Sequence, residues 1–292
     1  MDKAVSFLSF VILYGVSYGL VLFLISIGLV LTMGLMRVVN LAHGSFAAIG
    51  GYLCAFLMNR YAFPYGVAVV ASVLAVAALS VPIERVFYAR LYGASELDQV
   101  LMTVGLMLAT AATITLVFGP DVYPSSLPGV LARNIDLGFR TFQAYRLFVI
   151  VLGVALLVAL WYVFDRTSFG ALVRAAVDNP SMAESTGINV KLLFSATFAL
   201  GSGLAAMGGA IGFAMLPLEP LYPFKYLTLV LVVVVLAGIG NIKSSAGVAV
   251  AVGVVDTTGR YLAPTYGAFL IYGFLILVLL LRRLGAPGRG IA

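Results

Sequence analysis

The sequence predicts an all-α protein, a polytopic membrane helix bundle of about eight to nine transmembrane helices with one short helix outside the bilayer. Two observations predict this class. Of the 292 residues, 63% are hydrophobic and 10% are charged, whereas about a quarter of a soluble domain is charged. The apolar residues also form continuous runs, as in 229–240, and not the alternating pattern of a membrane barrel. Water-soluble enzymes and disordered proteins are therefore excluded.

Charge-free runs mark the expected spans, since a helix needs about 20 apolar residues to cross the hydrocarbon core. The first run, 4–36, would form a helix of about 50 Å and must tilt or begin at the interface. The second begins with a polar stretch, so its helix should start near Gly44. We expect nine spans: 4–36, 38–59, 64–83, 99–118, 147–164, 192–216, 226–240, 245–259 and 265–281.

Three connections separate these spans. Residues 84–98 are short and charged, 119–146 contain several prolines and should be rich in turns, and 165–191 are polar with helix signals of their own. If 165–191 is cytoplasmic, ten Lys and Arg lie on that side and seven on the other, which is the expected bias. We therefore predict an external N-terminus, a cytoplasmic C-terminus and a periplasmic loop 119–146. The chain 1–292 reads as a single transmembrane domain embedded in lipid.

Small residues recur four positions apart, as in the pairs Gly15/Gly19 and Gly208/Gly212. Such pairs let helix backbones approach closely within a bilayer. We interpret them as packing sites of the bundle.

Several kinds of chemistry are not indicated. His43 and Cys54 are the single histidine and the single cysteine, so no metal site and no internal disulfide are expected. The stretch 238–244 has Lys243-Ser244 but lacks the glycine of a phosphate-binding loop immediately before the lysine. We expect no bound cofactor and no nucleic-acid binding, because basic residues do not cluster with aromatics.

One ion pair is predicted inside the membrane. Asp256 is the one carboxylate that the predicted spans contain, and Arg260 follows four residues later. The two side chains could satisfy each other on one helix face. Alternatively, Asp256 could bind a coupling ion, because ionisable groups within spans are often functional.

The loop 165–191 should contain a short capped helix. Asn179 is a good N-cap, Pro180 suits the first helical position, and Gly187 can adopt the left-handed conformation that ends a helix. Its body is Ser181, Met182, Ala183 and Glu184, with Ser185 and Thr186 following. A helix this short needs a surface to pack on. That surface is either the lipid interface or, as we favour, a groove on a cytoplasmic protein.

Three stretches resemble the permease subunits of branched-chain amino-acid ABC importers. These are 34–44 (GLMRVVNLAHG), the loop motifs within 174–189, and the Gly-rich turn 237–242 (AGIGNI). Ala183 with Gly187 is also similar to the coupling segment of ABC-importer permeases, although Ser181-Met182 replaces part of the usual Glu-Ala-Ala pattern. The resemblance covers nearly the whole chain and is strongest to the smaller, H-type subunit. Lys243-Ser244-Ser245 departs from the Pro-Gly that usually follows the turn.

The resemblance implies a non-catalytic permease subunit in a bacterial inner membrane, forming half of a translocation path. Its partners would be a second homologous permease, cytoplasmic ATP-binding subunits docked on 179–187, and a periplasmic substrate-binding protein. Branched-chain amino acids, other amino acids, urea and small amides all remain possible substrates. An ion-coupled carrier or channel that uses Asp256 is the alternative function, and a non-transporting membrane scaffold is a third.

Arg37, Asn40 and His43 follow one another at intervals of three. If this stretch is helical, they share one face near the cytoplasmic end of the first two spans. They then form part of an inner gate or of the coupling surface. Alternatively, Asn40 and His43 satisfy backbone groups where the chain breaks before Gly44.

Overall fold

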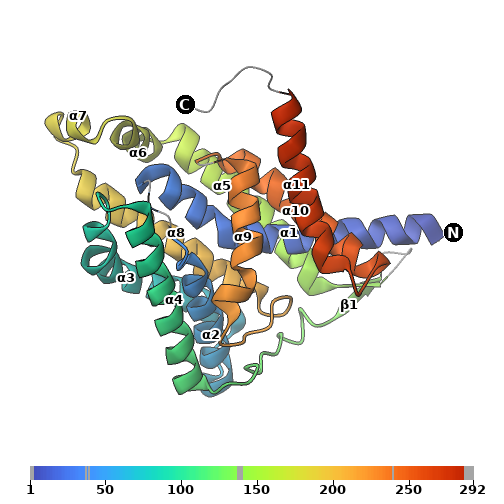
Figure 1. Ribbon diagram of the computed structural model, residues 1–292. Coiled ribbons are helices and arrows are strands. Elements are labelled where there is room, and N and C mark those ends of the chain that lie inside the picture. Colours follow the sequence, from blue (N-terminus) through green and yellow to red (C-terminus); the bar gives the residue numbers. More distant parts are fainter. Residues whose placement is uncertain (1–2, 37, 39, 137–140, 239, 286–292) are drawn as a thin grey trace.

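The computed structural model describes residues 3–36, 38, 40–136, 141–238 and 240–285, and it is predominantly helical (Figure 1). Each of the nine predicted spans coincides with one long helix. These helices are α1 (Lys3–Met36), α2 (His43–Tyr61), α3 (Tyr65–Val86), α4 (Glu96–Phe118), α5 (Ala144–Arg166), α8 (Val190–Gly212), α9 (Tyr222–Ala237), α10 (Ile242–Leu262) and α11 (Gly267–Gly285). The shorter elements are η1 (Tyr88–Arg90), α6 (Ser168–Asp178), α7 (Pro180–Ser185) and the strands β1 (Asn134–Asp136) and β2 (Thr141–Gln143).

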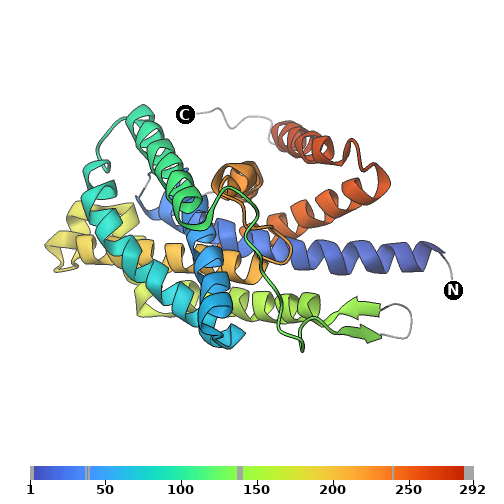
Figure 2. The same ribbon diagram turned by 90° about the horizontal axis from the view of Figure 1, so that it is seen from below.

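Helix α1 forms the centre of the molecule and runs along its longest dimension (Figures 1 and 2). Its residues from Leu20 to Leu31 are buried on every side. A helix that is apolar all round can be stable only inside a bundle or a membrane. In the part of the chain that the structure describes, α1 packs against α10, α8, α5 and α9.

Glycines allow the closest of these contacts. A Cβ on Gly15 would lie 2.7 Å from Cα of Val254 on α10. Cα of Val250 would lie 2.6 Å from a Cβ on Gly19. On α8, a Cβ on Gly208 would come within 2.9 Å of the Ile25 backbone nitrogen of α1. The interpretation of the small-residue pairs as packing sites is confirmed at these positions.

Helices α3 and α4 lie at the periphery and expose apolar side chains. Leu116 of α4 is 87% exposed, and Leu74 of α3 is 64% exposed. Exposed apolar surface of this extent is what lipid or another membrane subunit covers. By length and composition, five helices within the described residues can cross a membrane: Leu8–Gly34, Tyr65–Arg90, Glu96–Phe118, Ala144–Arg166 and Val190–Gly212. The protein is therefore a multi-pass membrane protein, and nine crossings stay a prediction.

The expected turn-rich segment 119–146 crosses one end of the bundle. Tyr123 donates a backbone hydrogen bond to Leu218 at 2.8 Å, and the Asn59 amide donates to the Pro124 carbonyl at 2.7 Å. The segment ends in a two-stranded antiparallel hairpin that pairs Ile135 with Phe142, which the sequence did not predict. The hairpin lies toward the end of the molecule that holds the N-terminus, and α7 lies at the opposite end (Figures 1 and 2).

Candidate functional site

The loop between α5 and α8 folds into two short helices. Helix α6 precedes the predicted capped helix, and its orientation follows from a tight turn after α5. Arg174 donates a hydrogen bond to the Phe164 carbonyl, and a side chain at Gly170 would collide with that same carbonyl. Asp165 and Lys243 form a salt bridge of 3.0 Å between the ends of α5 and α10. These contacts fix the base from which α7 projects.

Helix α7 has the predicted caps. The Asn179 side chain accepts a hydrogen bond of 3.0 Å from the backbone N–H of Met182, and Pro180 occupies the first turn. Gly187 has φ +87°, and its N–H donates to the Glu184 carbonyl at 3.0 Å. A residue with a Cβ is strained in this left-handed conformation. The short helix and both of its ends are therefore confirmed.

One face of α7 is left uncovered. Ala183 is 4% exposed and packs onto the rest of the bundle, whereas Met182 is 65% exposed. Ser181, Glu184 and Ser185 are exposed too. The uncovered face combines one large apolar side chain with polar neighbours, and it lies at the tip of the molecule (Figure 1).

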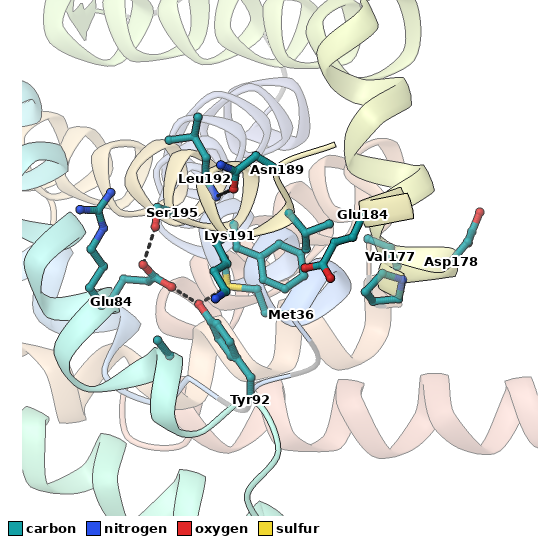
Figure 3. Close-up of a pocket in the computed structure, with 15 residues that line it drawn as sticks. Met36, Glu84, Tyr92, Val177, Asp178, Glu184, Asn189, Lys191, Leu192 and Ser195 are labelled. Carbon is teal, nitrogen blue, oxygen red and sulfur yellow. Dashed lines mark hydrogen bonds between the residues drawn. The ribbon is translucent and has the colours of Figure 1, made fainter. Parts of the chain in front are cut away.

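A cavity of about 820 Å³ lies beside this loop, between the end of α3 and the start of α8. Figure 3 shows Glu84 at its wall, between Ser195 and Tyr92. The Glu84 carboxylate accepts a hydrogen bond of 2.6 Å from the Ser195 hydroxyl and a second from the Tyr92 hydroxyl. Glu84 is 2% exposed although its carboxylate is ionisable. These bonds replace the hydration that burial removes.

The position of Glu84 shows that two predictions were wrong. The sequence placed it in a charged connection, 84–98, but α3 continues to Val86 and Glu84 lies within it. Asp256 is therefore not the one carboxylate that a span contains, since Glu84 falls in the apolar segment Tyr65–Arg90. Arg85, next to Glu84, made the stretch look like a solvated loop. The burial of Glu84 depends on Ser195, which lies 111 positions later in the chain.

Asn40 and His43 are both buried, but not on one helical face. Helix α1 ends at Met36 and α2 begins at His43, so Asn40 lies in the turn between them. A shared face was expected only if this stretch were helical. That condition is not met at Asn40, because the chain turns here and the His43 N–H donates to the Asn40 backbone carbonyl. Arg37 lies outside the described residues.

Each of the two side chains contacts a different part of the bundle. The side-chain oxygen Oδ1 of Asn40 accepts a hydrogen bond of 2.7 Å from the Tyr88 hydroxyl of η1. The His43 ring lies against α1, where a Cβ on Gly28 would be 2.5 Å from its Cε1 atom. Asn40 thus joins the α1–α2 turn to η1, and His43 joins α2 to α1.

Asp256 and Arg260 form the predicted pair on α10. Nε of Arg260 lies 2.9 and 2.8 Å from the two carboxylate oxygens of Asp256. Asp256 is 3% exposed, whereas the Arg260 side chain is 62% exposed. Both residues line a second cavity of about 630 Å³ that also includes Tyr14 and Arg146. Within the described residues, no three His, Cys, Asp or Glu side chains are grouped as metal ligands would be.

Comparison with known proteins identifies the family. A family model described as "Branched-chain amino acid transport system / permease component" matches residues 11–279. The permease protein BraD of the high-affinity branched-chain amino acid transport system of Pseudomonas aeruginosa is 26% identical, over 94% of each chain. The corresponding LivH protein of Escherichia coli K12 is also 26% identical over 94% of each chain.

A probable branched-chain amino acid transport permease protein, LivH of Methanocaldococcus jannaschii, is 25% identical over 90% of this chain and 85% of its own. No solved structure matches the chain. The family model covers most of the sequence, including all of α2 to α10. The chain therefore belongs to the family of branched-chain amino acid transport system permeases.

Proposed function

We propose that the chain is the permease subunit of an ATP-binding-cassette importer and forms half of a path for branched-chain or related amino acids. Transport proceeds by alternating access, and ATP is hydrolysed on separate subunits. The observation that carries this proposal is the uncovered face of α7. A capped helix of six residues at the tip of the bundle is too short to be stable alone. Its exposed Met182 is suited to a groove on a second protein.

The three relatives described above support the same assignment, because each of them is named as a permease of branched-chain amino acid transport. On this proposal the partners are a second permease of the same family, cytoplasmic ATP-binding subunits on 179–187, and a periplasmic binding protein that delivers the substrate. The protein lies in a bacterial inner membrane with its N-terminus outside and its C-terminus in the cytoplasm. The positions of α7 and the hairpin at opposite ends agree with this orientation.

Affinity purification from the native membrane in mild detergent tests the assembly. We expect a second permease and ATP-binding subunits to co-purify with the chain. A Met182→Arg variant should lose the ATP-binding subunits and keep the second permease, because the charge is placed on the docking face alone. Leu116→Arg, on an exposed apolar face of α4, is the contrasting variant and should keep the ATP-binding subunits. Recovery of a stable wild-type chain without partners would contradict the proposal.

We also propose that Asn40 and His43 belong to the inner gate, because they hold the α1–α2 turn against η1 and α1. Asn40→Ala and His43→Ala should assemble with all partners and reduce ATP-driven uptake. Normal uptake in both variants would leave these residues with a purely structural role.

A further inference from the structure

The cavity that holds Asp256 contains an unusual set of charges. We define the α1–α10 pocket by Phe10, Tyr14, Arg146, Tyr226, Asp256 and Arg260, which come from α1, α5, α9 and α10. Its volume of about 630 Å³ falls in the range of small-molecule sites, which is about 300–1,000 Å³. The pocket lies along the N-terminal half of α1, away from α7.

Arg146 carries the positive charge that is not neutralised. Its guanidinium carbon lies 3.8 Å from the centre of the Tyr14 ring, and Nη1 donates to the Ser17 hydroxyl at 3.2 Å. The Nε atom is buried and has no hydrogen-bond partner among the described residues. Among these residues Arg146 also forms no salt bridge. A guanidinium that is held by an aromatic ring and has an unpaired Nε–H favours a carboxylate, which an arginine can bind through two hydrogen bonds.

Asp256 supplies the opposite charge in the same pocket. Its two oxygens share the single Nε–H of Arg260. A carboxylate has about four lone-pair positions, so Asp256 retains acceptor capacity for an ammonium group. The other cation of the pocket, Lys225, is already paired with Glu219. The charges left to serve a ligand are therefore one guanidinium and one partly used carboxylate.

The remaining wall is mainly apolar. Ala214, Leu216 and Pro217 line it, together with the ring of Phe10. Such a wall would shield an aliphatic side chain of a ligand from water. Burial of that side chain stabilises the bound ligand through the hydrophobic effect, which needs no directional bonds.

From this arrangement we propose that the α1–α10 pocket binds a zwitterionic amino acid, with its carboxylate on Arg146 and its ammonium on Asp256. The aliphatic side chain then lies against the apolar wall. This inference rests on the proposed function and identifies a site on the permease where the transported substrate binds. The pocket favours the zwitterion, because a ligand without a carboxylate leaves the Arg146 charge without an opposite charge. A ligand without an ammonium leaves acceptor positions of Asp256 unused.

Cysteine protection tests this site directly. Thr257 lines the pocket, so a Thr257→Cys variant should react there with a maleimide. The native Cys54 is buried and gives the background rate in the parent chain. The variant is studied in its complete assembly with co-purified subunits in lipid nanodiscs, without the binding protein. The probes are leucine, leucine amide, which lacks the carboxylate, and 4-methylpentanoate, which lacks the ammonium.

Leucine should slow the labelling several-fold, and neither analogue should do so at the same concentration. Arg146→Gln should raise the leucine concentration needed for protection by at least about tenfold, since a charge-assisted bond is lost. Arg60→Gln makes the same change at an exposed arginine and should leave protection unaltered. When Asp256→Asn is added, 4-methylpentanoate should slow the maleimide labelling as strongly as leucine does. A merely structural Asp256–Arg260 pair predicts no such change of preference.

Three results would overturn the site: no protection by leucine, equal protection by all three probes, or full protection in Arg146→Gln. In parallel, the wild-type assembly is reconstituted in proteoliposomes with its binding protein, and ATP-driven leucine uptake is measured. If leucine is taken up but does not slow the labelling, the proposed binding site is refuted and the proposed function stands. If no ATP-driven uptake is found, the proposed function is refuted. The labelling results alone then show whether the pocket binds leucine.

Discussion

Replacing Glu84 by alanine should markedly destabilise the bundle at the end that carries α7. Glu84 accepts hydrogen bonds from Ser195 of α8 and from Tyr92, which follows η1. Each bond to a charged group contributes about 1.5–3 kcal/mol. Loss of both predicts a destabilisation of about 3 kcal/mol or more. For a protein of this size, that corresponds to a fall in melting temperature of roughly 6 °C or more.

The assay is the thermal denaturation of the detergent-solubilised assembly, followed by the loss of its monodisperse peak. Glu96→Ala removes an exposed glutamate in the first turn of α4 and is the control. It should shift the midpoint by no more than about 4 °C, because exposed charges at a helix start contribute about 0.3–1 kcal/mol. A double-mutant cycle with Ser195→Ala should give a coupling free energy of at least about 1 kcal/mol. Equal midpoints for Glu84→Ala and Glu96→Ala would refute this reasoning.

Two further predictions concern α7 and the helix contacts. Asn179→Ala removes the bond to the Met182 N–H and should destabilise α7 by about 1 kcal/mol, seen as faster amide exchange in 180–187 and weaker ATP-driven uptake. Asn179→Asp, which keeps the cap, should exchange at nearly the wild-type rate, and equal exchange in both variants would contradict this role of the cap. Gly209→Ala should reduce the yield of folded protein, because its Cβ would overlap the Ala47 carbonyl. Gly247→Ala, where no atom lies within 4 Å of the added Cβ, should be neutral or slightly stabilising, and a similar loss of yield in both glycine variants would count against the packing argument.

The sequence predicted the features that depend on neighbouring residues. Apolar runs located the nine long helices, because the length of a span follows from the thickness of the bilayer. Asn179, Pro180 and Gly187 located α7, since the capping residues lie within one or two turns of the groups they satisfy. Asp256 and Arg260 were paired correctly because a separation of four residues places them on one helix face.

The features that the sequence did not predict depend on contacts between distant residues. The burial of Glu84 requires Ser195, and the bond between Tyr88 and Asn40 joins positions 48 apart. The approach of Arg146 to Tyr14 needs α5 to pack beside α1. None of these partners shares a local pattern with the residue it contacts, so composition and spacing could not reveal them. The hairpin was missed because its strands are only three residues each.

The central claim, that this chain is a permease subunit driven by separate ATP-binding subunits, is tested most directly by reconstitution. The purified assembly is placed in proteoliposomes with the binding protein on one side and ATP on the other, and uptake of radiolabelled leucine is measured. We predict uptake that requires ATP and stops when the ATP-binding subunits are omitted. Uptake by the chain alone, without ATP and in response to an ion gradient, would contradict the claim. It would instead identify an ion-coupled carrier.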